Sequence, residues 1–381
     1  MSRPLRVALA IMYPLDASRR SGGLQAVACD LVRGFKAVDG LELHVVHCTK
    51  EVEADRVVQD GPVFVHYLHA PRRRVVPNML TSVWKLRREF RRIQPDVVNA
   101  HMGHYAAAGI LAGFPTVLTI HGIVWREAEI FRKTWFDRLR YRAATLFDRF
   151  AVQRVRRVVA INPYVRREYR AENDPRWTEI PIPVSEDYFA VPDRTVPGRI
   201  LCAGTVTELK NGLALLQALK LVRERVPEAH VHFAGRIDDR PYLKRMEAYA
   251  AENGLTEAVA FRGLIPYDET LRAYSECAVL ALTSRQESSP RVILEAAAAG
   301  KPSVAVRVGS VPDMIEDGVS GYVVPQDDIP SLADRLVRAL TDEPLRRRMG
   351  AAARQRVKER YSLRHVVARY VDLYRQVAQG G

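Results

Sequence analysis

The chain has 381 residues, 48% hydrophobic and 27% charged, and its 58 Lys and Arg against 44 Asp and Glu give a formal net charge of +14. This apolar content argues against intrinsic disorder, and the length suits two domains of roughly 100–200 residues each. The four cysteines lie far apart and form no C-x-x-C pair. A disulfide scaffold or a structural zinc site is therefore not expected.

The N-terminal segment, MSRPLRVALAIMY, has a basic start and a short apolar run, without the long apolar region or cleavage site of a signal peptide. No stretch approaches the ~18–20 consecutive apolar residues that a membrane-spanning helix needs. These features predict a cytoplasmic protein without an integral membrane segment.

In the first half of the chain, short apolar runs typical of strands alternate with longer amphipathic segments typical of helices. The predicted strands are Leu5–Ile11, Leu43–His47, Val63–Leu68, Asp96–Ala100, Thr116–Ile120 and Arg157–Ile161. The predicted helices are Gly23–Ala37, Asn78–Gln94 and Phe136–Arg156. Tyr188–Gly198, with two prolines and a glycine, then interrupts the pattern and is predicted to be a linker.

The same alternation restarts in the second half. The predicted strands are Arg199–Ala203, His230–Gly235, Val259–Phe261, Ala278–Leu282, Pro302–Val306 and Gly321–Val324. The predicted helices are Asn211–Arg225, Arg240–Asn253, Asp268–Glu276, Arg291–Ala299, Ser331–Asp342 and a long region from Pro344 to Ala378 that is broken near Tyr361. Apolar strands separated by helices indicate two α/β domains with doubly wound, Rossmann-like parallel sheets, which bind ligands at the carboxyl ends of their strands.

The segment Thr283–Gly300, TSRQESSPRVILEAAAAG, runs from a strand through a polar loop into a helix. It carries two carboxylates in an E-x7-E spacing, Glu287 in the loop and Glu295 in the helix. If the helix begins near Pro290, its free amides and positive dipole end suit an anion. Glu295 can then accept both hydroxyls of a ribose. The plain alternative is two surface glutamates that flank an ordinary helix start.

The whole segment, followed by Gly300-Lys301-Pro302, resembles the E-x7-E region of the retaining glycosyltransferases of family 4, which have the GT-B fold. The resemblance implies that Ser289, Pro290 and Arg291 contact the donor. It also implies an N-terminal acceptor-side domain over 1–188, a C-terminal nucleotide-sugar-binding domain over 189–360, and a C-terminal helix over 361–381 that returns to the first domain.

Two motifs in the first half match the same family. Ser21-Gly22-Gly23 follows the first predicted strand and resembles the family's N-terminal Gly-Gly loop, where glycines let amides approach a phosphate or sugar. By itself, Gly22-Gly23 would indicate only a turn. His121 follows a predicted strand and matches the family's cleft histidine, which implies a sugar-positioning role in catalysis rather than that of a base. A lone histidine is otherwise most often packed or on the surface.

In the second half, Gly204 opens a strand–loop–helix unit in which Lys210 matches the family's diphosphate-binding lysine. Thr205 stands where the family usually has an arginine, so the bidentate grip of a guanidinium is missing there. Either Thr205 and backbone amides suffice, or Arg285 or Arg291 replaces it. The resemblance also places the nucleotide base near Arg262 and Leu264.

The resemblance implies transfer of a sugar, with retention, from a UDP- or GDP-linked donor to a glycan or lipid-linked acceptor in cell-envelope or polysaccharide biosynthesis. Glu287 would orient the donor sugar and act with His121 as a catalytic residue. No D-x-D motif occurs, so no metal is expected for donor binding. The alternatives are another GT-B enzyme, such as a nucleotide-sugar epimerase or a phosphorylase, and a basic nucleic-acid-binding protein. No nucleic-acid-binding module is recognised, so no nucleic acid is expected as a partner.

Residues 72–92 hold the densest basic cluster. Met79, Val83, Leu86, Phe90 and Ile93 recur at helical spacing, which predicts a helix with one apolar face and basic residues elsewhere. This pattern fits a core-packed helix with a solvated basic face. It also fits peripheral docking to anionic lipid on the inner face of the membrane, in which basic residues of 132–142 would extend the surface.

Overall fold

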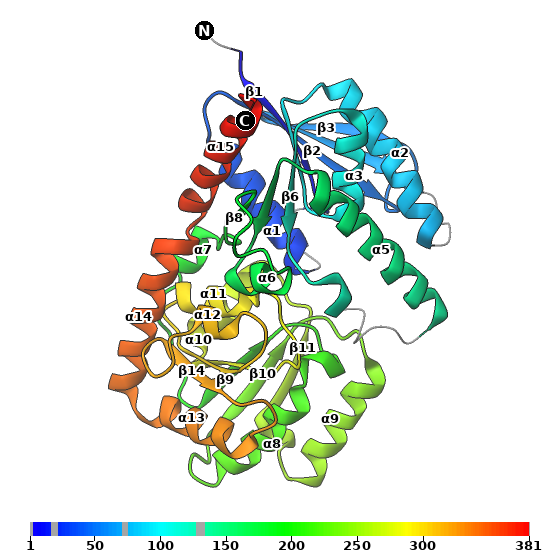
Figure 1. Ribbon diagram of the computed structural model, residues 1–381. Coiled ribbons are helices and arrows are strands. Elements are labelled where there is room, and N and C mark those ends of the chain that lie inside the picture. The colour runs from blue at the N-terminus through cyan, green and yellow to red at the C-terminus, as the bar shows by residue number, and fades with distance from the viewer. Residues whose placement is uncertain (1–2, 17–21, 71–74, 127–133, 381) are drawn as a thin grey trace. The chain divides into compact units, whose positions relative to one another are not determined.

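The computed structural model describes residues 3–16, 22–70, 75–126 and 134–380 (Figure 1). The chain forms two compact units, of which the first comprises residues 1–183 together with 363–381 and the second comprises 184–362. Each unit is built on one largely parallel sheet with helices between its strands, which confirms the predicted doubly wound α/β class.

The sheet of the first unit has eight strands in the order β3-β4-β2-β1-β5-β6-β7-β8. All neighbours are parallel except β3 and β4, which form an antiparallel pair at one edge. Strands β5 and β6 are buried along their whole length, as expected for strands covered on both faces. The strands are β1 Leu5–Ala10, β2 Leu41–Thr49, β3 Arg56–Asp60, β4 Val63–His69, β5 Val97–Ala100, β6 Thr116–Ile120, β7 Arg157–Ala160 and β8 Trp177–Glu179.

The helices of the first unit cover this sheet, and α2, α3 and α5 pack against one another. Helix α5 starts with a capping box, because the hydroxyl of Thr134 accepts from the N–H of Asp137 while the Asp137 carboxylate accepts from the N–H of Thr134. The helices are α1 Gly23–Phe35, α2 Val75–Ile93, α3 Gly103–Ala112, α5 Trp135–Arg154, α6 Pro163–Glu168 and α15 Leu363–Ala378.

The last helix, α15, belongs to the first unit although it follows the second unit in the sequence. It packs beside α1 (Figure 1), where a Cβ on Gly34 would come within 2.5 Å of Val367. From the same face of α15, the buried hydroxyl of Tyr374 accepts a hydrogen bond from Nδ2 of Asn99 in β5 at 2.7 Å. Close packing and a buried hydrogen bond therefore hold α15 in place.

The sheet of the second unit has six parallel strands in the order β11-β10-β9-β12-β13-β14. The strand order reverses between β9 and β12, which is where sheets of this kind bind ligands. The strands are β9 Arg199–Ala203, β10 His230–Ala234, β11 Val259–Gly263, β12 Val279–Leu282, β13 Ser303–Val306 and β14 Gly321–Val324. The α-helices are α7 Glu186–Phe189, α8 Gly212–Arg223, α9 Arg240–Glu252, α10 Tyr267–Glu276, α11 Arg291–Ala298, α12 Val311–Met314, α13 Ile329–Thr341 and α14 Glu343–Tyr361.

The boundary between the units lies after Pro183 rather than after residue 188, and the second unit ends at Ser362 rather than at residue 360. The N–H of Val184 donates to the carbonyl of Tyr361 at 2.9 Å, and α7 packs against α11. These contacts place residues 184–189 in the second unit. The sequence put the boundary later because the prolines and the glycine of the predicted linker come only at residues 192–198.

Four described elements of the first unit were not predicted from the sequence: β3, β8, α3 and the six-residue α6. All five residues of β3 are exposed, so no alternation of apolar and polar residues marks it, and β8 has only three residues. Helix α3, GHYAAAGILA, has no polar face because it packs against both α2 and α5. A helix buried on most sides lacks the amphipathic period on which the prediction relied.

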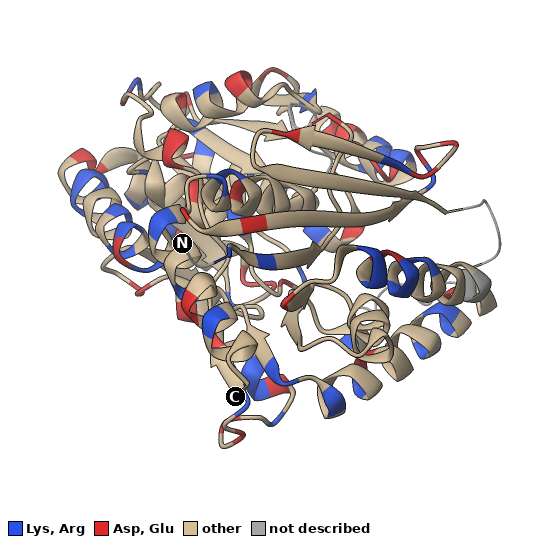
Figure 2. Ribbon diagram, turned by 90° about the horizontal axis from the view of Figure 1, so that it is seen from above, with Lys and Arg blue, Asp and Glu red and all other residues tan. Residues whose placement is uncertain are grey.

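Lys and Arg are spread over many helices and are interspersed with Asp and Glu (Figure 2). In α2 the predicted apolar face is confirmed, since Val83, Leu86 and Phe90 are buried. Arg72, Arg73 and Arg74 of the basic cluster lie outside the described residues, as do Arg132 and Lys133. None of the helices in the described ranges is long and apolar enough to cross a membrane.

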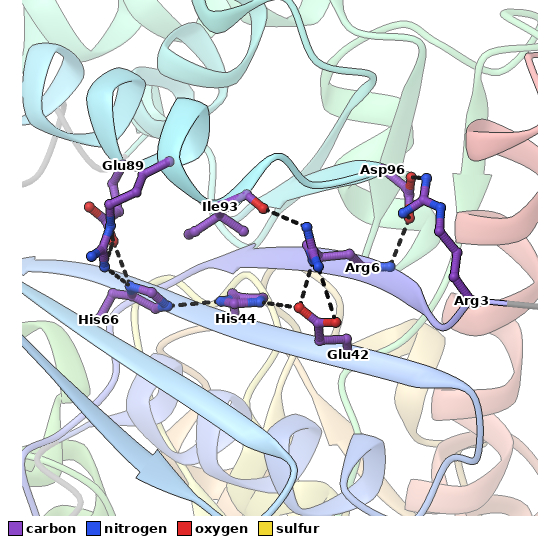
Figure 3. Close-up of polar contacts among 9 residues, drawn as sticks. Arg3, Arg6, Glu42, His44, His66, Glu89, Ile93 and Asp96 are labelled. Carbon is purple, nitrogen blue, oxygen red and sulfur yellow. Dashed lines mark hydrogen bonds and ion pairs between the residues drawn. The ribbon is translucent and has the colours of Figure 1, made fainter.

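A chain of polar contacts links β1, β2, β4 and α2 inside the first unit (Figure 3). Nε of Arg6 donates to Glu42 at 2.6 Å, and the same carboxylate lies 2.9 Å from Nε2 of His44. His44 lies 2.9 Å from His66, whose Nδ1 lies 2.6 Å from Glu89. Burial acts to raise the pKa of Glu89, but its hydrogen bonds outweigh that effect and lower the pKa. The network therefore keeps a buried carboxylate charged and joins three strands to a helix.

Candidate active site

The first predicted donor-binding residues follow β9 at the carboxyl edge of the second sheet. Gly204 has φ +139°, and its N–H donates to the carbonyl of Ala234 at 2.9 Å. The chain then passes Thr205 and forms a short 3-10 turn, Glu208–Lys210, before α8. Asn211, in the left-handed conformation, makes the sharp turn that places Lys210 beside this edge.

Lys210 and Glu287 contact each other directly. Nζ of Lys210 lies 2.6 Å from Oε1 of Glu287, a carboxylate that is only 8% exposed. Two further hydrogen bonds hold the segments that carry Lys210 and Glu287 together. The hydroxyl of Thr283 donates to the carbonyl of Lys210 at 3.2 Å, and the N–H of Arg285 donates to the carbonyl of Leu209 at 2.8 Å. Two residues far apart in the sequence therefore form one ion pair at the reversal point of the sheet.

Two residues that sequence analysis did not select shape this place. A Cβ on Gly309 would lie 1.5 Å from the carbonyl oxygen of Glu287, so only glycine fits behind that residue. The hydroxyl of Ser284 is buried, without a hydrogen-bond partner among the described residues. Ser284 lines a cavity of about 20 Å³ with Gly204, Thr205 and Lys210, which has room for about one water. A serine in a polar loop carries no sequence signal for such a position.

Glu295 is surrounded by hydrogen-bond donors. Helix α11 begins at Arg291, with Pro290 at the N-cap and Ser289 half-buried before it. Nε of Arg291 donates to Oε1 of Glu295 at 3.3 Å, and the hydroxyl of the buried Tyr274 donates to Oε2 at 2.7 Å. Burial raises the pKa of Tyr274 well above its usual value, so its phenol remains a neutral donor. Tyr274 was not predicted as a site residue, because it lies in α10, outside the segment Thr283–Gly300 on which the prediction was based.

Arg262 and Leu264 lie at the end of β11, separated from β9 by one strand. The Arg262 guanidinium pairs with Glu269 at 3.3 Å and remains half-exposed, and Leu264 is 62% exposed. Both side chains are therefore open to solvent at the same edge of the sheet as Lys210.

In the first unit, Gly22 is the exposed N-cap of α1, and Gly23 is the first residue of that helix. A Cβ on Gly22 would meet nothing within 4 Å, so this loop leaves open space at the helix start. Ser21 lies outside the described residues.

His121 directly follows β6 and meets His101, which directly follows the neighbouring strand β5. Nδ1 of His101 lies 2.6 Å from Nε2 of His121. Burial lowers the pKa of His121 to about 4 and that of His101 well below its usual value. Both rings are therefore neutral at pH 7. His101 was not predicted from the sequence, because nothing in NAHMGH distinguishes a paired histidine from a packed one.

In the described part of the chain, no group of three or more His, Cys, Asp or Glu side chains is arranged to hold a metal ion. The charged groups at the carboxyl edge of the second sheet include Lys210 and Glu287, and Glu287 shortly precedes the amino end of α11, which carries Glu295. Amide groups at a helix N-terminus and a nearby ammonium are suited to an anionic ligand such as a diphosphate.

Two doubly wound α/β units in one chain define the GT-B fold class. The sucrose-phosphate synthase (tll1590) from Thermosynechococcus elongatus has this fold with a TM-score of 0.83 and 18% identity, covering 99% of this chain and 100% of that one. Anabaena Alr3699/HepE, solved in complex with UDP-glucose, matches with a TM-score of 0.74 and 16% identity, covering 97% and 99% of the two chains.

The chain belongs to glycosyltransferase family 4. The family model described as "Glycosyltransferase Family 4" matches residues 21–187, and the model described as "Glycosyl transferases group 1" matches residues 186–356. A relative, the D-inositol 3-phosphate glycosyltransferase of Corynebacterium urealyticum, is 34% identical over 180 residues, which are 46% of this chain and 42% of the relative. The chain thus matches less than half the length of that relative.

Proposed function

We propose that this chain is a retaining glycosyltransferase that moves a sugar from a UDP- or GDP-linked donor to a glycan or lipid-linked acceptor in cell-envelope or polysaccharide biosynthesis. The observation that carries the proposal is the contact between Lys210 and Glu287 beside the amino end of α11, in a chain of this family. This arrangement provides a cation for a diphosphate and a carboxylate for sugar hydroxyls.

In this proposal the diphosphate takes the place of Glu287 at the Lys210 ammonium. Lys210 and the positive dipole end of α11 stabilise the charge that develops on the leaving phosphate, and no metal is required. Glu287, released from the lysine, accepts hydrogen bonds from the sugar hydroxyls. Glu295 accepts the ribose hydroxyls with the lone pairs that Arg291 and Tyr274 leave free.

Arg285, rather than Arg291, is the better substitute for the guanidinium that the family usually has at Thr205. The side chain of Arg291 is 8% exposed and is engaged with Glu295. The side chain of Arg285 is 48% exposed and lies 3.9 Å from Asp327, a weak surface pair that can be exchanged for a phosphate. The backbone N–H of Arg285 is hydrogen-bonded to Leu209, next to Lys210.

The donor is tested by a thermal-shift series with UDP, GDP and ADP in the presence of EDTA, followed by the matching nucleotide sugars. We expect stabilisation by UDP or GDP that EDTA does not abolish. The anomeric configuration of the product, followed by NMR, tests retention. No stabilisation by any of the three nucleotides would contradict the proposal, and epimerised nucleotide sugar without transfer would favour the epimerase alternative.

Two variants test the catalytic roles. Glu287→Gln and His121→Ala are expected to remain folded and to lose at least ~100-fold in kcat, because each removes a group that contacts the transferred sugar. Glu343→Gln is the matched control, since Glu343 pairs with the exposed Arg347 on the surface of α14. Turnover at the wild-type rate in both site variants would refute the assignments.

The acceptor side of the proposal includes an anionic membrane surface, bound from the cytoplasm by α2 and α5. These helices contact each other and expose large apolar side chains, including Trp84 and Leu80 on α2 and Trp135 on α5, which are 57–62% exposed. Arg88 and Arg138 are exposed on the same two helices. Tryptophan beside arginine suits the interface of an anionic bilayer.

Sedimentation with liposomes tests this surface. We expect binding to phosphatidylserine-containing vesicles that falls with added salt and is weakened by Trp84→Ser or Trp135→Ser. Leu264→Ser, an exposed apolar residue of the second unit, is the control. Equal binding to neutral and anionic vesicles, or no binding, would reject the membrane surface and leave the sugar-transfer proposal intact.

A further inference from the structure

The paired histidines of the first unit are joined by a single N–H···N hydrogen bond. Nδ1 of His101 and Nε2 of His121 are 2.6 Å apart, the two rings are 24° from coplanar, and their centroids are 4.8 Å apart. The centroid separation exceeds the nitrogen–nitrogen distance by about two ring radii, so the rings meet edge to edge rather than face to face. The shared proton therefore lies close to both ring planes, as a strong hydrogen bond requires.

Proton counting leaves two arrangements for the pair. Two neutral imidazoles carry two protons on four nitrogens, and one proton lies between the rings. The second proton is on Nδ1 of His121 if His101 is the donor of the shared bond. It is on Nε2 of His101 if His121 is the donor. The two arrangements differ in what His121 offers to a substrate: an N–H donor in the first and a bare acceptor nitrogen in the second.

The surroundings of His101 decide between them. His101 is 4% exposed, and its Nε2 is buried without a hydrogen-bond partner in the described ranges. An N–H at that atom would be a buried, unpaired donor, which is rare in proteins and is tolerated less well than a bare acceptor. His121 is only half-buried, and among the described residues its Nδ1 forms no hydrogen bond, so a proton there remains available to a ligand.

We infer that His101 is a positioning residue that donates from Nδ1 to Nε2 of His121 and thereby holds His121 as the Nδ1–H tautomer, a fixed hydrogen-bond donor for an oxygen of the transferred sugar. The sugar contact rests on the proposed function, whereas the tautomer does not. Free histidine in water favours the Nε2–H tautomer, so without His101 the N–H of His121 would be on the opposite nitrogen. The pair thus determines which side of His121 donates.

The tautomer is measured by nitrogen-15 NMR of the full chain labelled at histidine, with the His121 signals identified by their loss in His121→Ala. We expect a protonated Nδ1 and a bare Nε2 in the wild type. His101→Asn, whose amide N–H lies close to the position of Nδ1, is expected to keep that pattern, and His101→Leu to shift it towards Nε2–H. The control is His104→Leu, which removes a half-buried histidine that contacts Tyr105 and Phe147.

An Nε2–H tautomer of His121 in the wild type, or a pattern unchanged in His101→Leu, would overturn the assignment. In the transfer assay we expect His101→Leu to lower kcat roughly tenfold with little change in KM for the donor, and His101→Asn to recover most of the loss. Wild-type kcat in His101→Leu would refute the positioning role. If no nucleotide sugar binds to any variant, the proposed function fails and the sugar contact with it, while the tautomer is still decided by NMR.

Discussion

Replacement of Lys210 by methionine separates the structural from the functional part of the candidate site. Its partner Glu287 is 8% exposed and would lose the cation that lies 2.6 Å from its carboxylate. Breaking a fully buried ion pair costs about 3–5 kcal/mol. The lysine side chain is 31% exposed, so water would solvate part of the charge that remains. We therefore expect the free energy of unfolding to fall by about 1–3 kcal/mol.

The same substitution removes one charge-assisted contact to the diphosphate. Such a contact contributes about 1.5–3 kcal/mol, which predicts a Kd for UDP or GDP that is raised ~10- to 150-fold. Glu287→Gln is expected to change the Kd for the free nucleotide in the opposite direction, because the carboxylate no longer competes with the diphosphate for Lys210. We expect that variant to bind the nucleoside diphosphate at least as tightly as the wild type while losing turnover.

The double variant Lys210→Met/Glu287→Gln tests the reasoning directly. It buries no unpaired carboxylate, so we expect its unfolding free energy to return to within about 1 kcal/mol of the wild type while nucleotide affinity stays low. Urea denaturation measures the first quantity and isothermal titration calorimetry the second. A double variant as unstable as Lys210→Met, or wild-type nucleotide affinity in Lys210→Met, would refute the account of this pair.

Three further predictions concern the framework around the sites. Tyr374→Phe leaves its buried amide partner on β5 without an acceptor, so we expect a loss of about 1–3 kcal/mol in urea denaturation, and an unchanged midpoint would contradict the role given to α15. Burial raises the pKa of Asp148 to about 6 in the folded state, so folding favours the protonated carboxyl. Its contribution to stability is therefore complete when the pH is below the pKa of the unfolded chain and is lost as the pH rises through 6. Relative to Asp148→Asn, the wild type should therefore lose about 2 kcal/mol of unfolding free energy between pH 4 and 7, and parallel pH profiles would disprove this. Gly309→Ala should weaken nucleotide binding, because at φ +50° its Cβ would lie 1.5 Å from the carbonyl oxygen of Glu287. Gly254→Ala is the control: it has φ +67° in open space and should cost only ~1–2 kcal/mol of stability from backbone strain. Equal nucleotide affinity in both variants would exclude the steric argument.

Much of the fold could be predicted from local pattern because parallel strands buried on both faces are nearly continuous apolar runs. Strands such as Thr116–Ile120 and Arg199–Ala203 were predicted with the bounds that the structure has. Elements without that pattern were missed. Strand β3 is wholly exposed, and α3 is surrounded by other helices, so neither shows the period expected of its type.

The sequence by itself determined the α/β class, the resemblance to family 4 and the residue types of the candidate site, because short-range spacing and composition carry that information. It did not determine partnerships across the chain. That Lys210 contacts Glu287, that Tyr274 holds Glu295 and that His101 faces His121 depend on which strands are neighbours in a sheet. Strand order arises from long-range packing, and only the tertiary structure brings the carboxyl ends of β5 and β6, or of β9 and β12, to adjacent positions.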